Sequence, residues 1–336
     1  MTAGRSALLK ISTAPFLHEG MTTWRVMYEV LFALLPVVIA AVYFFGLTAL
    51  LTILSASLGA MITERVTSRD TSGLGTLADG SALITGVLLA LTLPPSFPLW
   101  MSFLGGVVSI GLGKSIWGGL GQNLFNPALV GRAFLQAAFP TAITTWTSPQ
   151  QGLWSLDASN LAMPLMKGEV DGVTSATPLG LAKFEGELTP LEPLLFGNTS
   201  GSLGETSALV LLVVGAWLAA RRIFDWRLVV STLGTVAAFS ALLHAIDPQA
   251  YPGALFMLTS GGLLFAAVFM VTDPVTTPVT PKGMWIFGAG AGVLVVLIRL
   301  WGGLPEGVMY GVLLMNAVTP LINRYTQPEP FGGAPA

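Results

Sequence analysis

Residues 26–45, which read VMYEVLFALLPVVIAAVYFF, decide the fold class of this chain. The stretch holds a single charged residue, Glu29, and it has the length of a helix that crosses the roughly 30 Å hydrocarbon core of a bilayer. It is too long for the core of a signal peptide, and no clear small-x-small cleavage site follows it. The stretch therefore predicts a first transmembrane helix that is retained.

The composition extends this prediction to the whole chain. Of its 336 residues, 53% are hydrophobic and 10% are charged, whereas soluble domains carry about 25% charged residues. The net charge is −2 and no basic run is present, which argues against nucleic acid as a partner. With no cysteine and only two histidines, the chain is poorly equipped to ligate an iron–sulfur cluster or a haem, so we predict no metal centre. If this chain carries electrons, it needs an organic cofactor.

Apolar stretches of similar length recur along the chain, and they predict an all-α polytopic membrane protein with about ten transmembrane helices. We expect the spans near residues 25–45, 47–64, 81–94, 99–113, 124–139, 205–222, 227–246, 254–272, 284–301 and 305–323. The expected organisation is an N-terminal segment (1–23), a first five-helix repeat (24–139), a polar loop (140–204), a second five-helix repeat (205–325) and a tail (326–336).

The distribution of charge predicts the orientation in the membrane. With the N-terminus inside, the cytoplasmic segments hold eleven of the fifteen basic residues, as the positive-inside rule requires. These are Arg5, Lys10, Arg25, Arg65, Arg69, Lys114, Arg221, Arg222, Arg227, Lys282 and Arg324. Both termini are then cytoplasmic, and the loop 140–204 is extracytoplasmic.

The two halves share faint similarities. The third span of each half looks interrupted, because residues 81–93 run into Pro94 and residues 260–272 run into Asp273 and Pro274. In the fifth spans, NPALVGR (126–132) is echoed by NAVTPLINR (316–324). Since each half has an odd number of spans, the halves must be inverted relative to one another, an arrangement in which broken helices build a site near the membrane midplane.

The polar loop contains DGVTSATPL, residues 171–179. No bulky side chain precedes Thr177 in this stretch and Pro178 has no N–H to donate, so we expect an exposed turn or loop that a modifying enzyme can reach. Taken alone, residues 174–177 are equally compatible with an ordinary hydroxyl-rich turn that caps a short helix at Thr174 or Thr177.

Five motifs in order resemble the D subunit of the Rnf ion-translocating electron-transport complex, to which the B subunit of the sodium-pumping NADH:quinone reductase is similar. They are residues 79–95, 126–132, 171–179, 272–276 and 309–324. The resemblance extends from about residue 14 to residue 325, and the chain length and short N-terminal segment favour the Rnf subunit.

The resemblance implies that FMN is esterified through its phosphate to Thr177. A separate flavin transferase would install it outside the cytoplasm, recognising Asp171 and the small residues Gly172, Thr174, Ser175 and Ala176. Family members often have Ser in place of Thr174 and Gly in place of Ser175, and both differences keep a small residue. A second, non-covalent flavin such as riboflavin is also implied, although no motif here locates it.

The resemblance further implies a membrane subunit of a redox pump in the bacterial inner membrane, which exchanges electrons between ferredoxin and NAD and couples them to Na⁺ or H⁺ transport. Iron–sulfur and flavin subunits are the expected partners. A flavin can pass electrons singly or in pairs, while the protein positions it and tunes its potential. Because the sequence carries no nucleotide-binding fingerprint, we expect a relay with no complete active site of its own.

Charged residues within or beside the spans are further candidates, because intramembrane charges are rare and mostly functional. Arg132 lies in the fifth span, where a role near the flavin and a structural salt bridge are both open. Asp273 begins a Thr- and Pro-rich break that could lie on an ion pathway, or it caps a helix at the interface. Glu29 is close enough to the start of its span to reach the interface.

Two alternatives remain. Inverted halves with broken third spans are also used by small-solute transporters, so a permease or channel is possible. The second alternative is the B-type subunit of a sodium-pumping NADH:quinone reductase. A permease has no need of residues 171–179, which distinguishes the first alternative from a flavin carrier.

Overall fold

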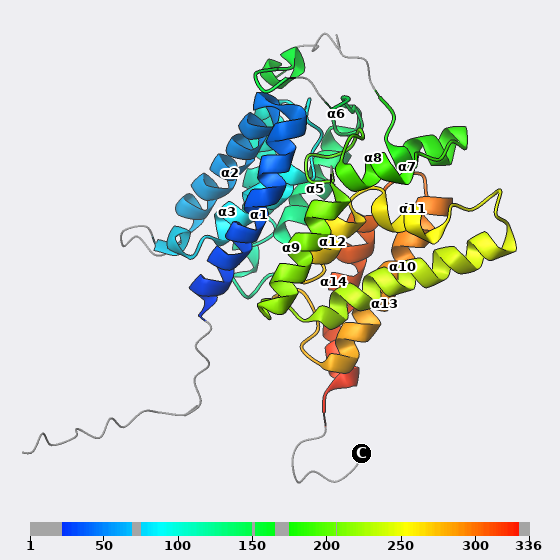
Figure 1. Ribbon diagram of the computed structural model, residues 1–336. Coiled ribbons are helices and arrows are strands. Elements are labelled where there is room, and N and C mark those ends of the chain that lie inside the picture. Colours follow the sequence, from blue (N-terminus) through cyan, green and yellow to red (C-terminus); the bar gives the residue numbers. More distant parts are fainter. Residues whose placement is uncertain (1–21, 69–74, 150–151, 165–174, 206, 329–336) are drawn as a thin grey trace, which may run out of the picture.

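The computed structural model describes residues 22–68, 75–149, 152–164, 175–205 and 207–328, and within these ranges the chain is helical with no strand. The first half contains α1 (Thr23–Phe45), α2 (Leu47–Thr67), α3 (Ser81–Leu91), α4 (Leu99–Gly111) and α5 (Pro127–Ala138). The short helix α6 (Pro140–Ile143) comes next, within the region that the sequence assigns to the polar loop. The short helices α7 (Pro178–Gly180) and α8 (Leu191–Phe196) follow. The second half contains α9 (Ala208–Ala220), α10 (Trp226–Ile246), α11 (Ala254–Thr259), α12 (Leu263–Phe269), α13 (Pro281–Trp301) and α14 (Val308–Thr326), and Figure 1 shows their arrangement.

Five helical stretches among the described residues are long and apolar enough to cross a bilayer. They are α1, α2, α10, α13 and the stretch Leu99–Trp117, which contains α4. Helices α3 and α9 are apolar but shorter. Large apolar side chains such as Phe32, Ile39 and Tyr43 are exposed on α1, as expected for a surface that faces lipid. The chain is therefore a polytopic, all-helical membrane protein, and the predicted fold class is confirmed.

Helix starts follow local sequence chemistry. The hydroxyl of Thr22 accepts the N–H of Arg25 at the start of α1, and Thr280 caps α13 in the same way. Helix α5 begins with Pro127, a residue favoured at the first helical position, after the cap residue Asn126. The fifth span therefore begins a few residues later than the apolar stretch 124–139 predicts.

Glycine allows the closest helix packing in the molecule. The most extensive helix contacts are α2 with α4 and α10 with α13. A Cβ atom on Gly59 would lie 2.2 Å from the carbonyl oxygen of Phe103, and one on Gly106 would lie 2.2 Å from that of Ala56. No side chain larger than hydrogen fits there, so the glycine-rich stretch that includes Gly106 serves close helix packing.

The eighth predicted span, residues 254–272, is divided between α11 and α12. The sequence suggested an interruption only at its far end, near Asp273, but the chain also breaks at Gly261, whose φ of +66° is left-handed and favours glycine. The guanidinium of Arg299 donates to the carbonyls freed by this break, at 2.6 Å from Met257 O and 3.0 Å from Ser260 O. Such compensation is needed because lipid offers no donors to a broken helix.

The third predicted span is also short, because α3 ends at Leu91. The carbonyl of Leu91 accepts the N–H of Gly204 at 2.6 Å. Beyond the helix, the side chain of Asn160 donates to the carbonyls of Pro95 and Phe97, at 2.9 Å each. Two segments of the region between the halves therefore donate hydrogen bonds to carbonyl groups at and just beyond the end of α3.

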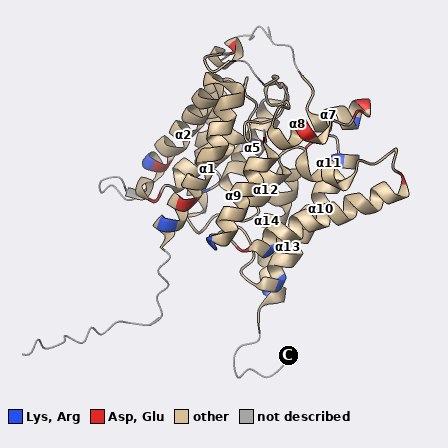
Figure 2. Cartoon of the chain, viewed as in Figure 1, with Lys and Arg blue, Asp and Glu red and all other residues tan. Residues whose placement is uncertain are grey.

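The two ends of the bundle differ. Helix α1 begins and α14 ends at one end, while α7 and α8 lie at the other (Figure 1). Lys and Arg residues gather at the end where α1 begins (Figure 2). The segment that carries Thr177 precedes α7 and therefore lies at the end opposite to this basic surface.

Candidate functional site

Thr177 ends an extended segment and caps a short helical turn. Its backbone is extended (φ −73°, ψ 155°), and its Oγ1 accepts the N–H of Gly180 at 3.1 Å. Its carbonyl accepts the N–H of Leu181 at 2.9 Å, and Pro178 follows as the first helical residue. The capping role that the sequence allowed for Thr177 is thus present. The Thr177 hydroxyl donates to no acceptor among the described residues.

The residues before Thr177 are fixed to neighbouring segments. The N–H of Ser175 donates to the carbonyl of Trp146 at 3.0 Å, and the Ser175 hydroxyl donates to Ser200 Oγ at 2.6 Å. Ala176 is exposed and Thr177 is half-buried. The remaining predicted residues of this segment, Asp171, Gly172 and Thr174, lie outside the described residues.

Thr177 stands at the wall of a cavity of about 520 Å³, which we name the outer-end cavity. Sites for small molecules commonly measure about 300–1,000 Å³, so this volume suits a cofactor. Its lining combines aromatic, hydroxyl and charged side chains. These include Arg132, Gln136, Trp146, Ser175, Thr199, Ser200, Glu205, Glu306 and Tyr310.

The charged groups of the outer-end cavity differ in their partners. Glu306 accepts the N–H of Gly262 at 2.9 Å and a bond from the guanidinium of Arg299 at 3.2 Å, and both donors stabilise the negative charge of its carboxylate. Among the described residues, Glu205 accepts a long hydrogen bond from the N–H of Ser202, at 3.4 Å. Arg132 forms no ion pair within 4 Å and no hydrogen bond to any described residue. The nearby acidic residue is Glu205, which lines the same cavity and whose charge interacts with that of Arg132.

A lysine near Thr177 was not singled out by the sequence. The ammonium of Lys183 donates to carbonyl oxygens at the end of α13, at 2.8 Å from Arg299 O, 2.5 Å from Gly302 O and 3.1 Å from Leu304 O. Burial lowers the pKa of Lys183 from its usual value. No spacing pattern could have revealed this contact, because the acceptors are main-chain atoms more than a hundred residues away.

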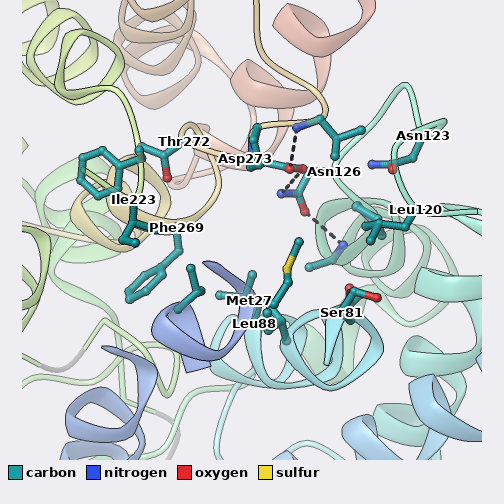
Figure 3. A pocket seen from close by; sticks show the side chains of 18 of the residues that line it. Met27, Ser81, Leu88, Leu120, Asn123, Asn126, Ile223, Phe269, Thr272 and Asp273 are labelled. Atoms are coloured by element: carbon teal, nitrogen blue, oxygen red, sulfur yellow. Dashed lines mark hydrogen bonds between the residues drawn. The ribbon is translucent and has the colours of Figure 1, made fainter. Parts of the chain in front are cut away.

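A second cavity of about 110 Å³ is lined by residues that include Met27, Lys114, Asn126 and Asp273. Figure 3 shows it from close by, with Met27, Asn126 and Asp273 labelled. Met27 lies near the start of α1. We name it the basic-end cavity. Asp273 accepts the N–H of Val275 at 3.1 Å, so it caps a turn, and it also faces this cavity.

Asn126 and Asn316, which the sequence paired as an echo between the halves, are in contact. The N–H of Asn126 donates to Asn316 Oδ1 at 3.2 Å, and the amide of Asn126 donates to Asp273 Oδ2 at 3.4 Å (Figure 3). The bond between Asn126 and Asp273 joins the start of α5 to the non-helical segment that follows α12.

The wall of the basic-end cavity contains an ion pair that sequence reasoning missed. Lys114 Nζ lies 2.8 and 2.9 Å from the two carboxylate oxygens of Glu64 and 2.7 Å from Ser81 Oγ. The exposed fractions of Lys114 and Glu64 are 2% and 6%. The two residues stand fifty positions apart on α2 and after α4, so only the fold brings them together.

Glu29 behaves as an interfacial residue. Its carboxylate pairs with Arg25 at 3.0 Å and with Arg221 at 2.8 Å, and both guanidinium groups are largely exposed. These ion pairs link the start of α1 to the end of α9.

The chain is similar to known proteins over nearly its whole length. The sequence pattern of the NQR2, RnfD, RnfE family matches residues 10–332. The chain is 39% identical over 335 residues to the D subunit of the proton-translocating ferredoxin:NAD(+) oxidoreductase complex of Clostridium ljungdahlii, covering 97% of this chain and 96% of the relative. It is 43% identical to the D subunit of the ion-translocating oxidoreductase complex of Stutzerimonas stutzeri, with 92% of each chain covered. The corresponding protein of Escherichia coli O157:H7 is 36% identical, with 97% of this chain and 99% of the relative covered.

Proposed function

The chain belongs to the NQR2, RnfD, RnfE family, and from this premise we propose that it relays electrons through FMN bound covalently to Thr177. It is a membrane subunit of an ion-translocating ferredoxin:NAD oxidoreductase complex, and so part of a redox-driven translocase. Other subunits of that complex are its partners. Electrons would reach it from iron–sulfur and flavin subunits, since this chain alone carries no complete active site.

One observation carries the proposal for FMN: the Thr177 hydroxyl lies at the wall of a cavity of about 520 Å³ and donates no hydrogen bond to a described residue. The Thr177 oxygen accepts the N–H of Gly180, and an ester oxygen retains a lone pair for this bond. Esterification would therefore replace only the hydroxyl hydrogen. The turn that presents Thr177 would keep its cap.

The lining of the outer-end cavity suits a flavin phosphate. The Arg132 guanidinium lacks a protein anion within 4 Å among the described residues and faces the cavity, and arginine binds phosphate oxygens in a bidentate manner. Trp146 and Tyr310 offer aromatic surfaces of the kind that pack against planar rings. Bound FMN would supply one- or two-electron transfer, while these side chains hold it and exclude water.

The modification itself needs a flavin transferase. We propose that this enzyme recognises Asp171 and the small residues Gly172, Thr174, Ser175 and Ala176 on the extracytoplasmic side. The exposure of Ala176 is consistent with access to this segment.

A second, non-covalent flavin is proposed at the basic-end cavity. Asn123, Asn126 and Asp273 supply amide and carboxyl groups there, which can hydrogen-bond the polar edge of a flavin ring. The volume of about 110 Å³ is small for such a ring, so Met27 and Leu120 would have to move to admit it. A riboflavin-type ligand would suit this site, because the cavity presents the carboxylate of Asp273 where a phosphate would meet repulsion.

The coupling ion, Na⁺ or H⁺, is proposed to pass near Asp273. This carboxylate lies at a break in the helices and faces a cavity, as ion-binding residues of membrane transporters do. The proposed inner-membrane topology, with both termini in the cytoplasm and Thr177 outside, is supported by the gathering of Lys and Arg at the end where α1 begins.

Two inverted five-helix halves, residues 24–139 and 205–325, are proposed as the architecture. The packing of α2 on α4 in the first half has its counterpart in that of α10 on α13 in the second, and α4 with α5 corresponds to α13 with α14. Helices α5 and α14, which occupy the fifth place in each half, also contact one another.

The test is in-gel flavin fluorescence of protein made together with the flavin transferase and then denatured. We expect a fluorescent band for the wild-type chain, its loss in Thr177→Ala and its retention in Thr174→Ala. An unmodified Thr177 peptide in mass spectra of the active complex, or a dark wild-type band, would refute covalent attachment. That result would favour the permease alternative, which requires no redox cofactor.

A further inference from the structure

Lys183 joins the Thr177 turn to the end of a transmembrane helix. Its ammonium lies within hydrogen-bonding distance of four carbonyl oxygens, belonging to Ile298, Arg299, Gly302 and Leu304. The first two belong to the last turn of α13 and the other two to the segment that follows it. This contact is therefore a polar link between the Thr177 turn and the end of α13.

The physical basis of the contact is the C-terminus of α13. The last carbonyl groups of a helix have no intrahelical donor and carry the negative end of the helix dipole. An ammonium group has three donors and a full positive charge, so it matches this cluster of acceptors. Although Lys183 is only half-buried, three of its contacts are 3.1 Å or shorter and converge on one helix end, which is unlike a lysine extended along a surface.

The link between Lys183 and Thr177 is short and regular. Residues 178–180 form α7 and Leu181–Glu185 continue it as a single wider helical turn. The N–H of Leu181 donates to the Thr177 carbonyl, so this backbone connects the two side chains without an intervening loop. On the other side of Thr177, Ser175 is held by Trp146 and Ser200. Thr177 therefore lies between two anchors, and Lys183 makes the stronger, charge-assisted one.

We propose that Lys183 is a positioning residue for the covalent cofactor, holding the Thr177 turn against the end of α13 so that the attached group stays in the outer-end cavity. This inference rests on the proposed attachment of FMN to Thr177. The same end of α13 carries the Arg299 side chain, which bonds Glu306 in the cavity and the carbonyls at the break between α11 and α12. Lys183 thus connects the Thr177 turn to the segment after α13, and residues 303–306 of that segment line the outer-end cavity.

The experiment compares Lys183→Met, Lys183→Gln and Lys183→Arg in the purified complex, with Lys282→Met as the matched control. Lys282 lies on α13, at the end opposite to the one that Lys183 contacts, and it is exposed, so its replacement removes a lysine without touching the Thr177 turn. In-gel fluorescence first establishes that each variant carries the flavin. A dark band for the wild-type chain would count against the proposed function, whereas the next two measurements address Lys183 alone.

The first measurement is the fluorescence anisotropy of the Thr177 flavin, isolated by subtracting the signal of the Thr177→Val complex. We expect Lys183→Met and Lys183→Gln to lower it toward the value of the denatured protein, and Lys183→Arg to restore most of it. The second is turnover: kcat should fall at least about tenfold with an unchanged KM for NAD, because displacing a reacting group by about 1 Å can cost as much as a hundredfold in rate. Wild-type anisotropy and kcat in both Lys183→Met and Lys183→Gln, or equal losses in Lys282→Met, would overturn the inference.

Discussion

Lys114 and Glu64 form an ion pair in which both side chains are buried, and replacing Lys114 by Met tests how much it contributes to stability. The substitution removes contacts of 2.8 and 2.9 Å to the Glu64 carboxylate and one of 2.7 Å to Ser81 Oγ. Methionine has a similar length, so the packing around the aliphatic part of Lys114 is largely kept.

The expected loss of stability in Lys114→Met follows from the burial of the ion pair. Removing one partner of a buried ion pair leaves the other charge without compensation and typically costs about 3–5 kcal/mol. Glu64 lies within one turn of the end of α2, where water can reach the carboxylate after modest rearrangement, so we expect the lower value, about 3 kcal/mol. For a chain of this size, that corresponds to a fall in apparent Tm of about 4 °C.

The assay is thermal unfolding of the purified complex in detergent, followed by loss of monodisperse protein at one fixed heating rate. The fixed rate matters because irreversible unfolding makes the apparent Tm depend on it. Arg65→Met is the matched control. Arg65 neighbours Glu64 in sequence, carries the same charge as Lys114 and is exposed, so its replacement should change the apparent Tm by no more than about 1 °C.

The double variant Glu64→Leu, Lys114→Met removes both charges and should recover most of the lost stability, because paired buried charges contribute little net free energy compared with apolar residues of similar size. The reasoning would be refuted if Lys114→Met melted together with Arg65→Met. It would also be refuted if the double variant were less stable than Lys114→Met, since that would make the pair itself a net source of stability.

Four further predictions concern packing and the two cavities. Gly106→Val should destabilise the chain by about 1–3 kcal/mol in the same assay, because a Cβ atom at this position would lie 2.2 Å from a backbone oxygen. Gly303→Ala is the control: a Cβ atom there has no other atom within 4 Å, so this change should alter the stability by no more than about 0.5 kcal/mol. Thr177→Ser should keep a fluorescent band in denaturing gels, and Thr177→Val should lose it, because the ester needs a hydroxyl. Arg132→Met should leave the apparent Tm within about 2 °C of wild type, since no described residue pairs with it, but should shift the flavin midpoint potential in a redox titration. Asp273→Asn keeps a carbonyl oxygen to cap its turn and should lower ion-dependent turnover without unfolding the complex.

Much of the fold was accessible from the sequence because the bilayer leaves few choices for an apolar segment. The runs that predicted α1, α2, α10 and α13 needed only length and hydropathy. Helix starts at Thr22 and Thr280 could be read from residues that cap helices through their own hydroxyl groups. These features depend on residues a few positions apart, which is the range that sequence patterns cover.

The break inside residues 254–272 was not predicted, because its cause is not local. Gly261 permits the left-handed backbone, but glycine is common in membrane helices and does not by itself end one. What stabilises the break is Arg299, which donates to the freed carbonyls from another helix. The pairing of Lys114 with Glu64 escaped prediction for the same reason, since each was one charged residue near the end of a span.

The candidate site likewise contains residues that the sequence indicated and residues that only the fold reveals. The family resemblance, and not the motif alone, predicted Thr177 to be the modified residue, and the structure adds that it caps a turn at the wall of a cavity. Arg132 was a candidate on the ground that intramembrane charges are rare, and it lines the same cavity. Glu205, Glu306 and Lys183 were not singled out, because their importance depends on which segments meet at the end of α13.

Several polar residues that the sequence did not single out share one role, which is to donate hydrogen bonds to carbonyl groups at helix ends. Every carbonyl freed at a helix end inside the bundle requires a donor from the protein, since lipid provides none. Asn160 supplies donors after α3, Arg299 at the break before α12 and Lys183 at the end of α13. Glu306, which Arg299 binds, and Leu304, whose carbonyl Lys183 binds, both line the outer-end cavity, so the donors that complete these helix ends also contact residues of its wall. A substitution of either donor should therefore disturb a helix end and the flavin site together, and a variant that altered only one of them would separate the two roles.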